Sequence, residues 1–186
     1  MATHDPRAPR DRHRYAKLCP MRIPEFDASP AEIRGFAVVQ VVLVGVFLAV
    51  LFWAFGGRDG TIPPWWLIVP LLAAPAVAAF FAERVWLEAR PLDPADPPED
   101  VTKQAVSVFA GQTLLKLYFC TASIIFAIVI GFVFRNHAGW PIVIGGVPSL
   151  AVMAFEIWPS ARNTSMTEVM LNAEGADSKL VQTFLR

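Results

Sequence analysis

The sequence predicts an all-α protein, a polytopic bundle of four transmembrane helices. Three observations indicate this fold class: long apolar stretches with almost no charge, tryptophans at the ends of those stretches, and basic residues on alternate connections. The first uncharged apolar run, Gly35 to Gly57, has 23 residues. At ~1.5 Å of rise per residue, a helix of that length crosses the ~30 Å hydrocarbon core of a bilayer. With 55% hydrophobic residues and a mean hydropathy of +0.46, the chain is too apolar for a soluble domain.

Four such stretches, together with their connections, use most of the 186 residues. The predicted spans are approximately residues 35–57, 62–82, 115–134 and 138–157. We therefore divide the chain into three parts. Residues 1–28 are a basic, flexible cytoplasmic tail without helical periodicity. Residues 29–159 are the transmembrane domain, and residues 160–186 are a cytoplasmic amphipathic tail.

The first helix is predicted to begin at a capping box. Ser29 can cap the N3 amide, Pro30 suits the first turn, and Glu32 can reach back to the cap. The segment Asp96-Pro97-Pro98-Glu99 repeats this start signal, and apolar residues follow it at helical spacing. The third helix is therefore predicted to run from this segment to Phe134, well beyond its span.

The C-terminal tail carries a third capping box, Ser165-Met166-Thr167-Glu168. It leads into an apolar stripe at i, i+3, i+4 and i+7 spacing, and a second apolar face follows after Gly175. The two faces consist of Met166, Val169, Met170 and Ala173, and of Leu180, Val181, Phe184 and Leu185. We expect two short helices whose apolar faces lie against the inner membrane surface or against a partner.

Basic residues predict the orientation. Thirteen Lys and Arg residues lie in the two tails and the middle connection, whereas the other two connections contain only Arg58 and Arg135, with Lys116 left out at a span boundary. Because basic residues concentrate on the cytoplasmic side, we expect both termini inside the plasma (inner) membrane. The turns near Gly60 and His137 are then outside. All six tryptophans lie at predicted span ends, where an amphipathic indole is most stable.

Helix-breaking residues interrupt the second and fourth spans. Pro70 and Pro75 remove backbone donors from the second span, and the fourth contains Gly145, Gly146 and Pro148. Broken helices can expose carbonyl groups to a transported solute. More often, neighbouring helices or local rearrangement satisfy the freed groups. We therefore interpret these residues as kinks that serve packing.

The two halves of the chain share a pattern that suggests two tandem helical hairpins. Each half has a base near the start of its first helix, Arg34 or Lys116, and an acid near the end of its second, Glu83 or Glu156. Antiparallel neighbours joined by a short turn return to the same depth, so we predict two structural ion pairs, one in each hairpin. Arg34 is expected to face Glu83, and Lys116 to face Glu156. Glu156 lies a full crossing after Arg135, at the inner interface, which disfavours a proton relay at the midplane.

The sequence carries no catalytic, cofactor-binding or metal-binding signature. Its three histidines are scattered, and its two cysteines, Cys19 and Cys120, have neither metal nor disulfide spacing. Beside a membrane, the bases of the N-terminal tail are predicted to contact anionic lipid headgroups and not nucleic acid. These bases are Arg7, Arg10, Arg12, Arg14, Lys17 and Arg22.

We therefore expect a non-enzymatic membrane protein, an accessory or assembly subunit of a larger membrane complex. Its partners would be the lipid bilayer and other membrane subunits or further copies of itself. Dry aromatic spans and faces of small residues suit such lateral packing. The alternative is a small oligomeric transporter or channel that uses the kinked second and fourth helices. A third hypothesis is a membrane enzyme that acts on lipid at the inner interface.

Overall fold

The computed structural model describes residues 29–57 and 59–185. These residues form helices and connecting segments, and no strand occurs among them. The predicted lipid contacts of the N-terminal tail, from Arg7 to Arg22, lie outside the described residues. The elements are α2 (Pro30–Ala54), α3 (Trp65–Arg84), the 3-10 helix η1 (Val85–Glu88), α4 (Pro98–Val133), the 3-10 helix η2 (Arg135–His137), the π-helix η3 (Ile142–Gly146), α5 (Val147–Ile157), α6 (Ala161–Leu171) and α7 (Leu180–Leu185).

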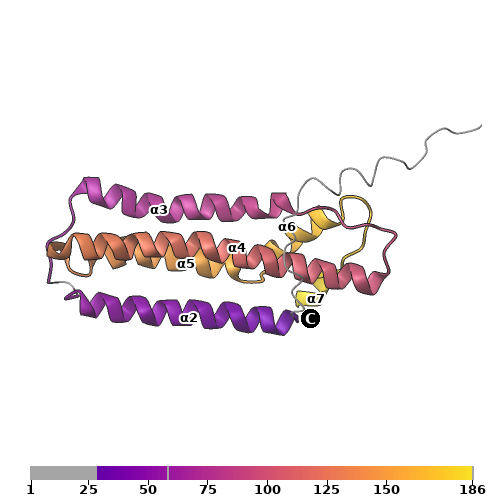
Figure 1. Ribbon diagram of the computed structural model, residues 1–186, viewed down its shortest axis with the longest axis horizontal. Coiled ribbons are helices and arrows are strands. Elements are labelled where there is room, and N and C mark those ends of the chain that lie inside the picture. The colour runs from indigo at the N-terminus through magenta and orange to yellow at the C-terminus, as the bar shows by residue number, and fades with distance from the viewer. Residues whose placement is uncertain (1–28, 58, 186) are drawn as a thin grey trace, which may run out of the picture.

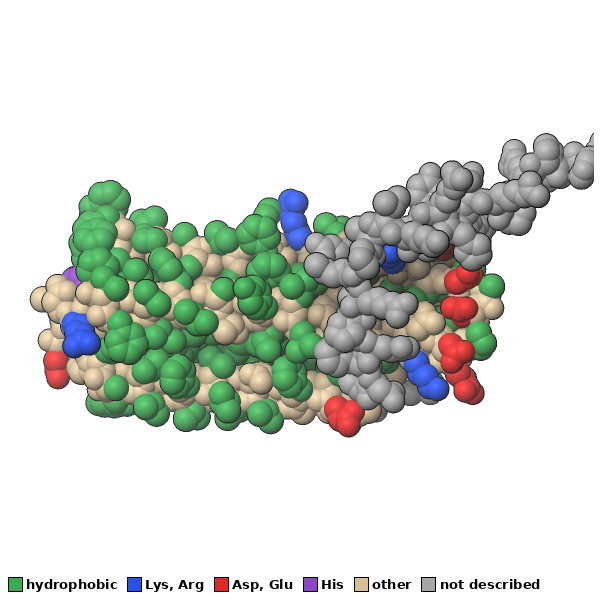
Figure 2. Space-filling model, in the orientation of Figure 1, with side chains coloured by type: hydrophobic (Ala, Val, Ile, Leu, Met, Phe, Trp, Pro, Cys, Tyr) green, Lys and Arg blue, Asp and Glu red, His purple; other side chains and the backbone are tan. Residues whose placement is uncertain are grey.

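The helices form one elongated bundle (Figure 1). By length and composition, α2, α4 and α3 with its extension to Leu87 can each cross a membrane. The fourth span is shorter, since Ile142–Ile157 qualifies only together with α6, which follows after a bend of 52°. Hydrophobic side chains cover the length of the bundle, and most acidic side chains gather at the end that carries α6 and α7 (Figure 2). The predicted all-α bundle is thus confirmed, with three helices long and apolar enough to cross a membrane, or four if the bent pair is one span.

We call the end with α6 and α7 the cap end and the opposite end the turn end. Between them, α4 and α5 form the centre of the bundle. α3 packs against both of these helices, and α2 packs mainly against α5 and η3. α2 and α3 therefore lie on opposite sides of the central pair (Figure 1). The second predicted hairpin is present, but the first is open, because its two helices are not close neighbours.

Hydrogen bonds between the two loops at the turn end explain this separation. The loop between α2 and α3 crosses to the far side of the bundle. Hydrogen bonds join it to the loop between α4 and η3. The Gly139 amide donates to Gly57 O at 3.0 Å, and the Thr61 amide donates to Asn136 O at 3.0 Å. Nδ1 of buried His137 lies 2.9 Å from Thr61 O, to which it can only donate. These bonds hold α2 and α3 apart at fixed positions.

The predicted kink residues occupy positions that helices tolerate. α3 remains one helix through Pro70 and Pro75. Pro148 follows closely on the π-helical segment η3, so its missing amide donor falls where the helix changes pitch on entering α5. Gly145 and Gly146 end the π-helical segment η3, so the irregularity of the fourth span is a change of helical pitch.

Gly145 marks a close approach of three helices. A Cβ at this position would lie 2.9 Å from Ala127 Cβ of α4 and 2.9 Å from Leu71 Cδ2 of α3. The Gly145 carbonyl accepts a hydrogen bond from Ser149 Oγ at 2.7 Å, and Ser149 Oγ lies 2.6 Å from Ser123 Oγ. At this level the bundle is closely packed, and its buried hydroxyl groups are paired.

Two of the three predicted helix starts are observed in the structure. Ser29 and Glu32 form the expected capping box, in which the Ser29 amide donates to Glu32 Oε2 at 2.6 Å. α4 covers the predicted range to within a residue at each end, but its N-cap is Pro97 and no side chain caps it. α6 begins after Ser160, whose hydroxyl accepts from the Asn163 amide at 3.3 Å. The predicted cap at Ser165 is therefore wrong.

The cap is a second small core beyond the spans. It is formed by the start of α2, the segment around Leu92, the first turns of α4, the end of α6, and α7. Phe109 and Phe184 pack in it with ring centroids 4.8 Å apart. The C-terminal tail is thus folded against α4 rather than lying apart from the bundle. The buried residues of this core are Ile33, Leu92, Val101, Ala105, Val106, Phe109, Ala110, Leu171, Ala176, Leu180 and Phe184.

The face of α6 that packs inside the protein is not its apolar stripe, which was expected to lie against the membrane surface or a partner. Met166 and Val169, two members of that stripe, are exposed. The polar side chains opposite are buried because they find hydrogen-bond partners inside the protein; Thr167 Oγ1, for example, donates to Gln112 Oε1 at 2.8 Å. The buried residues of α6 are Asn163, Thr164, Thr167 and Leu171.

We expect Gly145→Ala to destabilise the protein and Gly35→Ala to leave it unchanged or slightly more stable. The methyl group added at Gly145 overlaps Ala127 and Leu71, and overpacking a dense core costs about 1–3 kcal/mol. A methyl group at Gly35 meets no atom within 4 Å and favours the helix. Thermal unfolding in detergent measures both. Equal stability of the two variants would contradict the close packing at Gly145.

Candidate functional site

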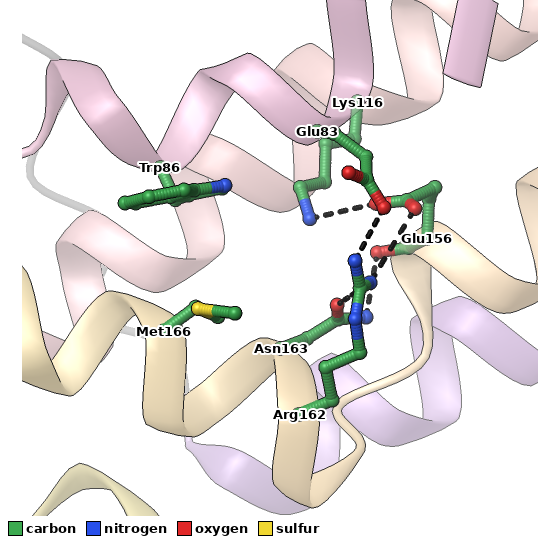
Figure 3. Close-up of a pocket in the computed structure, with 7 residues that line it drawn as sticks. All are labelled: Glu83, Trp86, Lys116, Glu156, Arg162, Asn163 and Met166. Carbon is green, nitrogen blue, oxygen red and sulfur yellow. Dashed lines mark hydrogen bonds and ion pairs between the residues drawn. The ribbon is translucent and has the colours of Figure 1, made fainter. Parts of the chain in front are cut away.

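Four charged side chains from four helices meet at the cap end. Figure 3 shows them pointing toward one another, with Trp86, Asn163 and Met166 around them. Since each helix contributes one member, the contacts tie α3, α4, α5 and α6 together at one level. We call these residues the ionic cluster: Glu83 of α3, Lys116 of α4, Glu156 of α5 and Arg162 of α6.

Lys116 and Glu156 form the buried half of the ionic cluster. Lys116 Nζ donates to Glu156 Oε2 at 2.9 Å, and the two residues are 7% and 3% exposed. These are the two groups that were expected to face each other because they lie at matching depths in the third and fourth helices, and they are in direct contact. A single charge at this depth would be costly, and the attraction offsets that cost because each charge has a hydrogen-bonded partner.

Arg162 connects the buried half of the cluster to its exposed half. Its Nη1 lies 3.7 Å from Oε1 of Glu156, and its Nη2 donates to Glu83. The Arg162 and Glu83 side chains are both partly exposed to the surroundings. In water, such an exposed pair contributes little to stability compared with a buried one. The carboxylate of Glu156 is thus shared between a buried ammonium and a partly exposed guanidinium.

Glu83 pairs with Arg162. The predicted pair of Arg34 and Glu83 is therefore wrong. α2, which carries Arg34, packs on the side of the central helices that faces away from α3 (Figure 1). Counting residues along each span predicts the depth of a charge along the membrane normal, but it does not predict which neighbouring helix supplies the partner of that charge. The neighbour is chosen here by the loop connections at the turn end.

Asn163 holds the end of α5 and the start of α6 together. Its Nδ2 lies 3.1 Å from Phe155 O, 3.1 Å from Glu156 O and 2.8 Å from Trp158 O. The last carbonyl groups of a helix lack partners within it, and Asn163 supplies a donor for them. The carbonyl groups of α5 are therefore satisfied where the chain turns by 52° into α6.

Neither Arg162 nor Asn163 was expected in this site from the sequence. Both stand in a polar stretch after Pro159 that has no apolar periodicity. Ser160 is the sequence signal that could have indicated these two residues, because a serine after the proline that ends a span is a favourable N-cap. A helix that starts there places Arg162 in its first turn, beside the end of the fourth span.

The ionic cluster leaves a cavity of about 10 Å³, lined by its four members and by Trp86, Asn163 and Met166. That volume is at the lower limit for one water molecule. The two bases and two acids balance in formal charge. Among the described residues, no group of three or more His, Cys, Asp or Glu is placed to hold a metal ion. The site joins four helices and leaves room for one water.

Comparison with known proteins places the chain in no family, since neither a family model, nor a curated protein, nor a solved structure matches it. Its function is therefore inferred from its own geometry. The ionic cluster, the close contact at Gly145 and the exposed faces of the helices are the features that bear on it.

Lys116→Met and Glu156→Gln should each destabilise the protein, by about 3–5 kcal/mol, because each leaves a buried charged group without its main partner. The double variant should lose less than the sum of the two single losses, since neither group is then left behind. Reversible unfolding in mixed micelles measures this coupling.

The control for this cycle is the exposed pair of Lys179 and Asp177, whose Nζ and Oδ2 atoms lie 3.8 Å apart. The same cycle on that pair should give a coupling below about 1 kcal/mol. Strictly additive losses at Lys116 and Glu156 would show that the two groups do not interact.

Proposed function

We propose that this chain is a non-enzymatic accessory or assembly subunit of a larger membrane complex, with α2 as its docking helix. The observation that carries the proposal is the small share that α2 has in the fold. Of its most apolar window, 11% is buried inside the protein, against 28% for the α3 span and 33% for α4. A helix with so little intramolecular contact has most of its surface available to a neighbour.

The exposed face of α2 has the pattern of a helix-packing seam. Its members are separated alternately by four and three residues, the heptad spacing of helices that pack along their length. Small and β-branched side chains permit close approach and lose little rotamer freedom on packing. The exposed surface of α3 carries four bulky aromatics, Trp65, Trp66, Phe80 and Phe81, whereas that of α2 carries two, Phe47 and Trp53. The seam on α2 consists of Gly35, Val39, Val42, Val46, Ala49 and Trp53.

The interior of the bundle supports a structural role over a catalytic one. At Gly145 the approach of α3, α4 and η3 leaves no room for a single methyl group. At the ionic cluster the charged groups are paired with one another around space for one water. Both features hold helices in place, and neither resembles a pocket for a substrate.

A small oligomeric transporter or channel is the alternative, and one observation favours it. The segment η3, Ile142–Gly146, is π-helical, and π-helical turns inside helices are frequent at functional sites. A solute path would have to run between copies of the chain, because the centre of each copy is closed at Gly145. A purified homo-oligomer that conducts ions across a planar bilayer would favour this alternative.

For orientation, we propose that the chain lies in the plasma (inner) membrane with its cap and both termini in the cytoplasm, following the distribution of basic residues. Gly60 and His137 are unsuitable reporters, because a Cβ at Gly60 would overlap the backbone at His137 and the His137 side chain is buried. Asn136 at the turn end and Glu99 at the cap end are exposed.

In intact cells, a cysteine at Asn136 should therefore react with an impermeant maleimide. A cysteine at Glu99 should react only after permeabilisation. The labelling is done in a Cys19→Ser background, which leaves only buried Cys120. Reaction of the Glu99 cysteine in intact cells would invert the proposed orientation.

The docking role of α2 is tested by Val46→Trp, with Val77→Trp on the exposed face of α3 as the matched control. Both positions are exposed, so lipid accommodates either indole. A partner helix packed against α2 would not accommodate the indole introduced at Val46. After extraction in mild detergent, we expect Val46→Trp to lose stoichiometric membrane subunits that co-purify with the wild type and with Val77→Trp. Equal recovery of the same subunits from both variants would contradict α2 as the docking helix.

A further inference from the structure

The helix α6 has its polar side inside the protein and part of its apolar side outside. Asn163 and Thr167 are buried and hydrogen-bonded, whereas Met166 is 42% exposed and Val169 is 68% exposed. A helix whose outer face meets water has the reverse arrangement. The exposed side of α6 therefore suits an environment less polar than water.

The exposed apolar side chains of α6 continue a strip that begins on the membrane-spanning part of α5. Phe155, near the end of α5, is 60% exposed, and the guanidinium of Arg162 lies 5.2 Å from the centroid of its ring. Met166 and Val169 follow one and two helical turns after Arg162. We call Phe155, Arg162, Met166 and Val169 the α6 strip. It continues the exposed apolar surface of α5 across the bend into α6.

Geometry keeps the α6 strip close to the membrane edge. The axis of α6 is bent by 52° from that of Ile142–Ile157. From Arg162 to Val169 the rise along α6 is ~10 Å, which corresponds to ~6 Å along the direction of the fourth span. The headgroup layer on one side of a bilayer is ~5–8 Å thick. If the ionic cluster marks the edge of the hydrocarbon, Val169 still lies within the headgroup layer.

We propose that α6 is an interfacial helix, and that the occupant of its exposed face is the boundary between headgroups and acyl chains of the adjacent leaflet. Amphipathic helices bind at this depth with their apolar face toward the acyl chains. Trp158, which is also exposed, stands at the junction of α5 and α6, and the boundary is where indole rings are most stable.

The charges beside the strip complement such a lipid surface. Arg84, at the end of α3, lies with its guanidinium 4.4 Å from the centroid of the Phe80 ring, as Arg162 lies over Phe155. At both places an arginine covers an exposed aromatic ring at the cap end of a span. An arginine held in this way has its stem in the apolar region and its charge at the level of the lipid phosphates. This inference stands whether or not α2 docks onto other subunits.

The test places a single cysteine at Met166, at Val169 or, as a control, at Gln182, in the full chain with Cys19→Ser. Gln182 is exposed on α7 and lines the same surface groove as Thr102 of α4. Thr102 precedes Lys116 by ~21 Å of helix, well below the membrane edge. Each cysteine carries a bimane fluorophore, and the protein is placed in nanodiscs of phosphatidylethanolamine and phosphatidylglycerol. A lipid with a nitroxide near the top of its acyl chain serves as the quencher.

We expect several-fold stronger quenching at Met166 and Val169 than at Gln182, together with blue-shifted emission at the first two positions. Water-like emission and equal, weak quenching at all three positions would overturn the proposal. Protection of Met166 and Val169 in native membranes, combined with water-like emission in nanodiscs, would also overturn it and would assign the α6 strip to a protein partner. Unchanged thermal unfolding of each labelled variant shows that the fold is intact during the measurement.

Discussion

A charge buried at the edge of a membrane needs a partner at the same depth, and the pair formed by Lys116 and Glu156 meets this requirement at 2.9 Å. The pair joins α4 to α5, the two helices at the centre of the bundle. Arg162 extends it to α3 through Glu83, and Asn163 satisfies the carbonyl groups where α5 turns into α6. The place at which α6 joins the bundle therefore depends on this contact, and the apolar core of the cap holds α6 and α7 against α4.

The opposite end of the bundle is held by backbone bonds between loops, and the middle by the close approach at Gly145. These three levels fix α3, α4 and α5 to one another, so the interior has little freedom to open. Of the three long spans, α2 has the smallest buried share, and its seam is exposed. A rigid core with one weakly engaged helix fits a protein that works by lateral contact better than one that works by internal movement.

The sequence predicted what depends on depth and missed what depends on direction. Span positions, the capping box at Ser29 and the contact of Lys116 with Glu156 follow from lengths and local patterns, which one sequence contains. The partner of Glu83 could not be predicted, because it depends on the side of α4 and α5 against which the first helix packs. The stripe of Met166 and Val169 gave the correct apolar face of α6, but a stripe looks the same whether it faces protein or lipid. The hydrogen bonds of Asn163 and Thr167 show that the polar face of α6 is the one that packs inside the protein.

The central claim is that Lys116 and Glu156 are in direct contact within the bilayer. The most direct measurement is dipolar recoupling by solid-state NMR between ¹⁵Nζ of lysine and ¹³Cδ of glutamate, in protein reconstituted into lipid. Among the described residues, this is the one Lys–Glu ion pair in the structure. The structure predicts strong dephasing of one lysine signal, which disappears in Lys116→Met. A lysine spectrum without that dephasing, or with dephasing that persists in Lys116→Met, would contradict this contact.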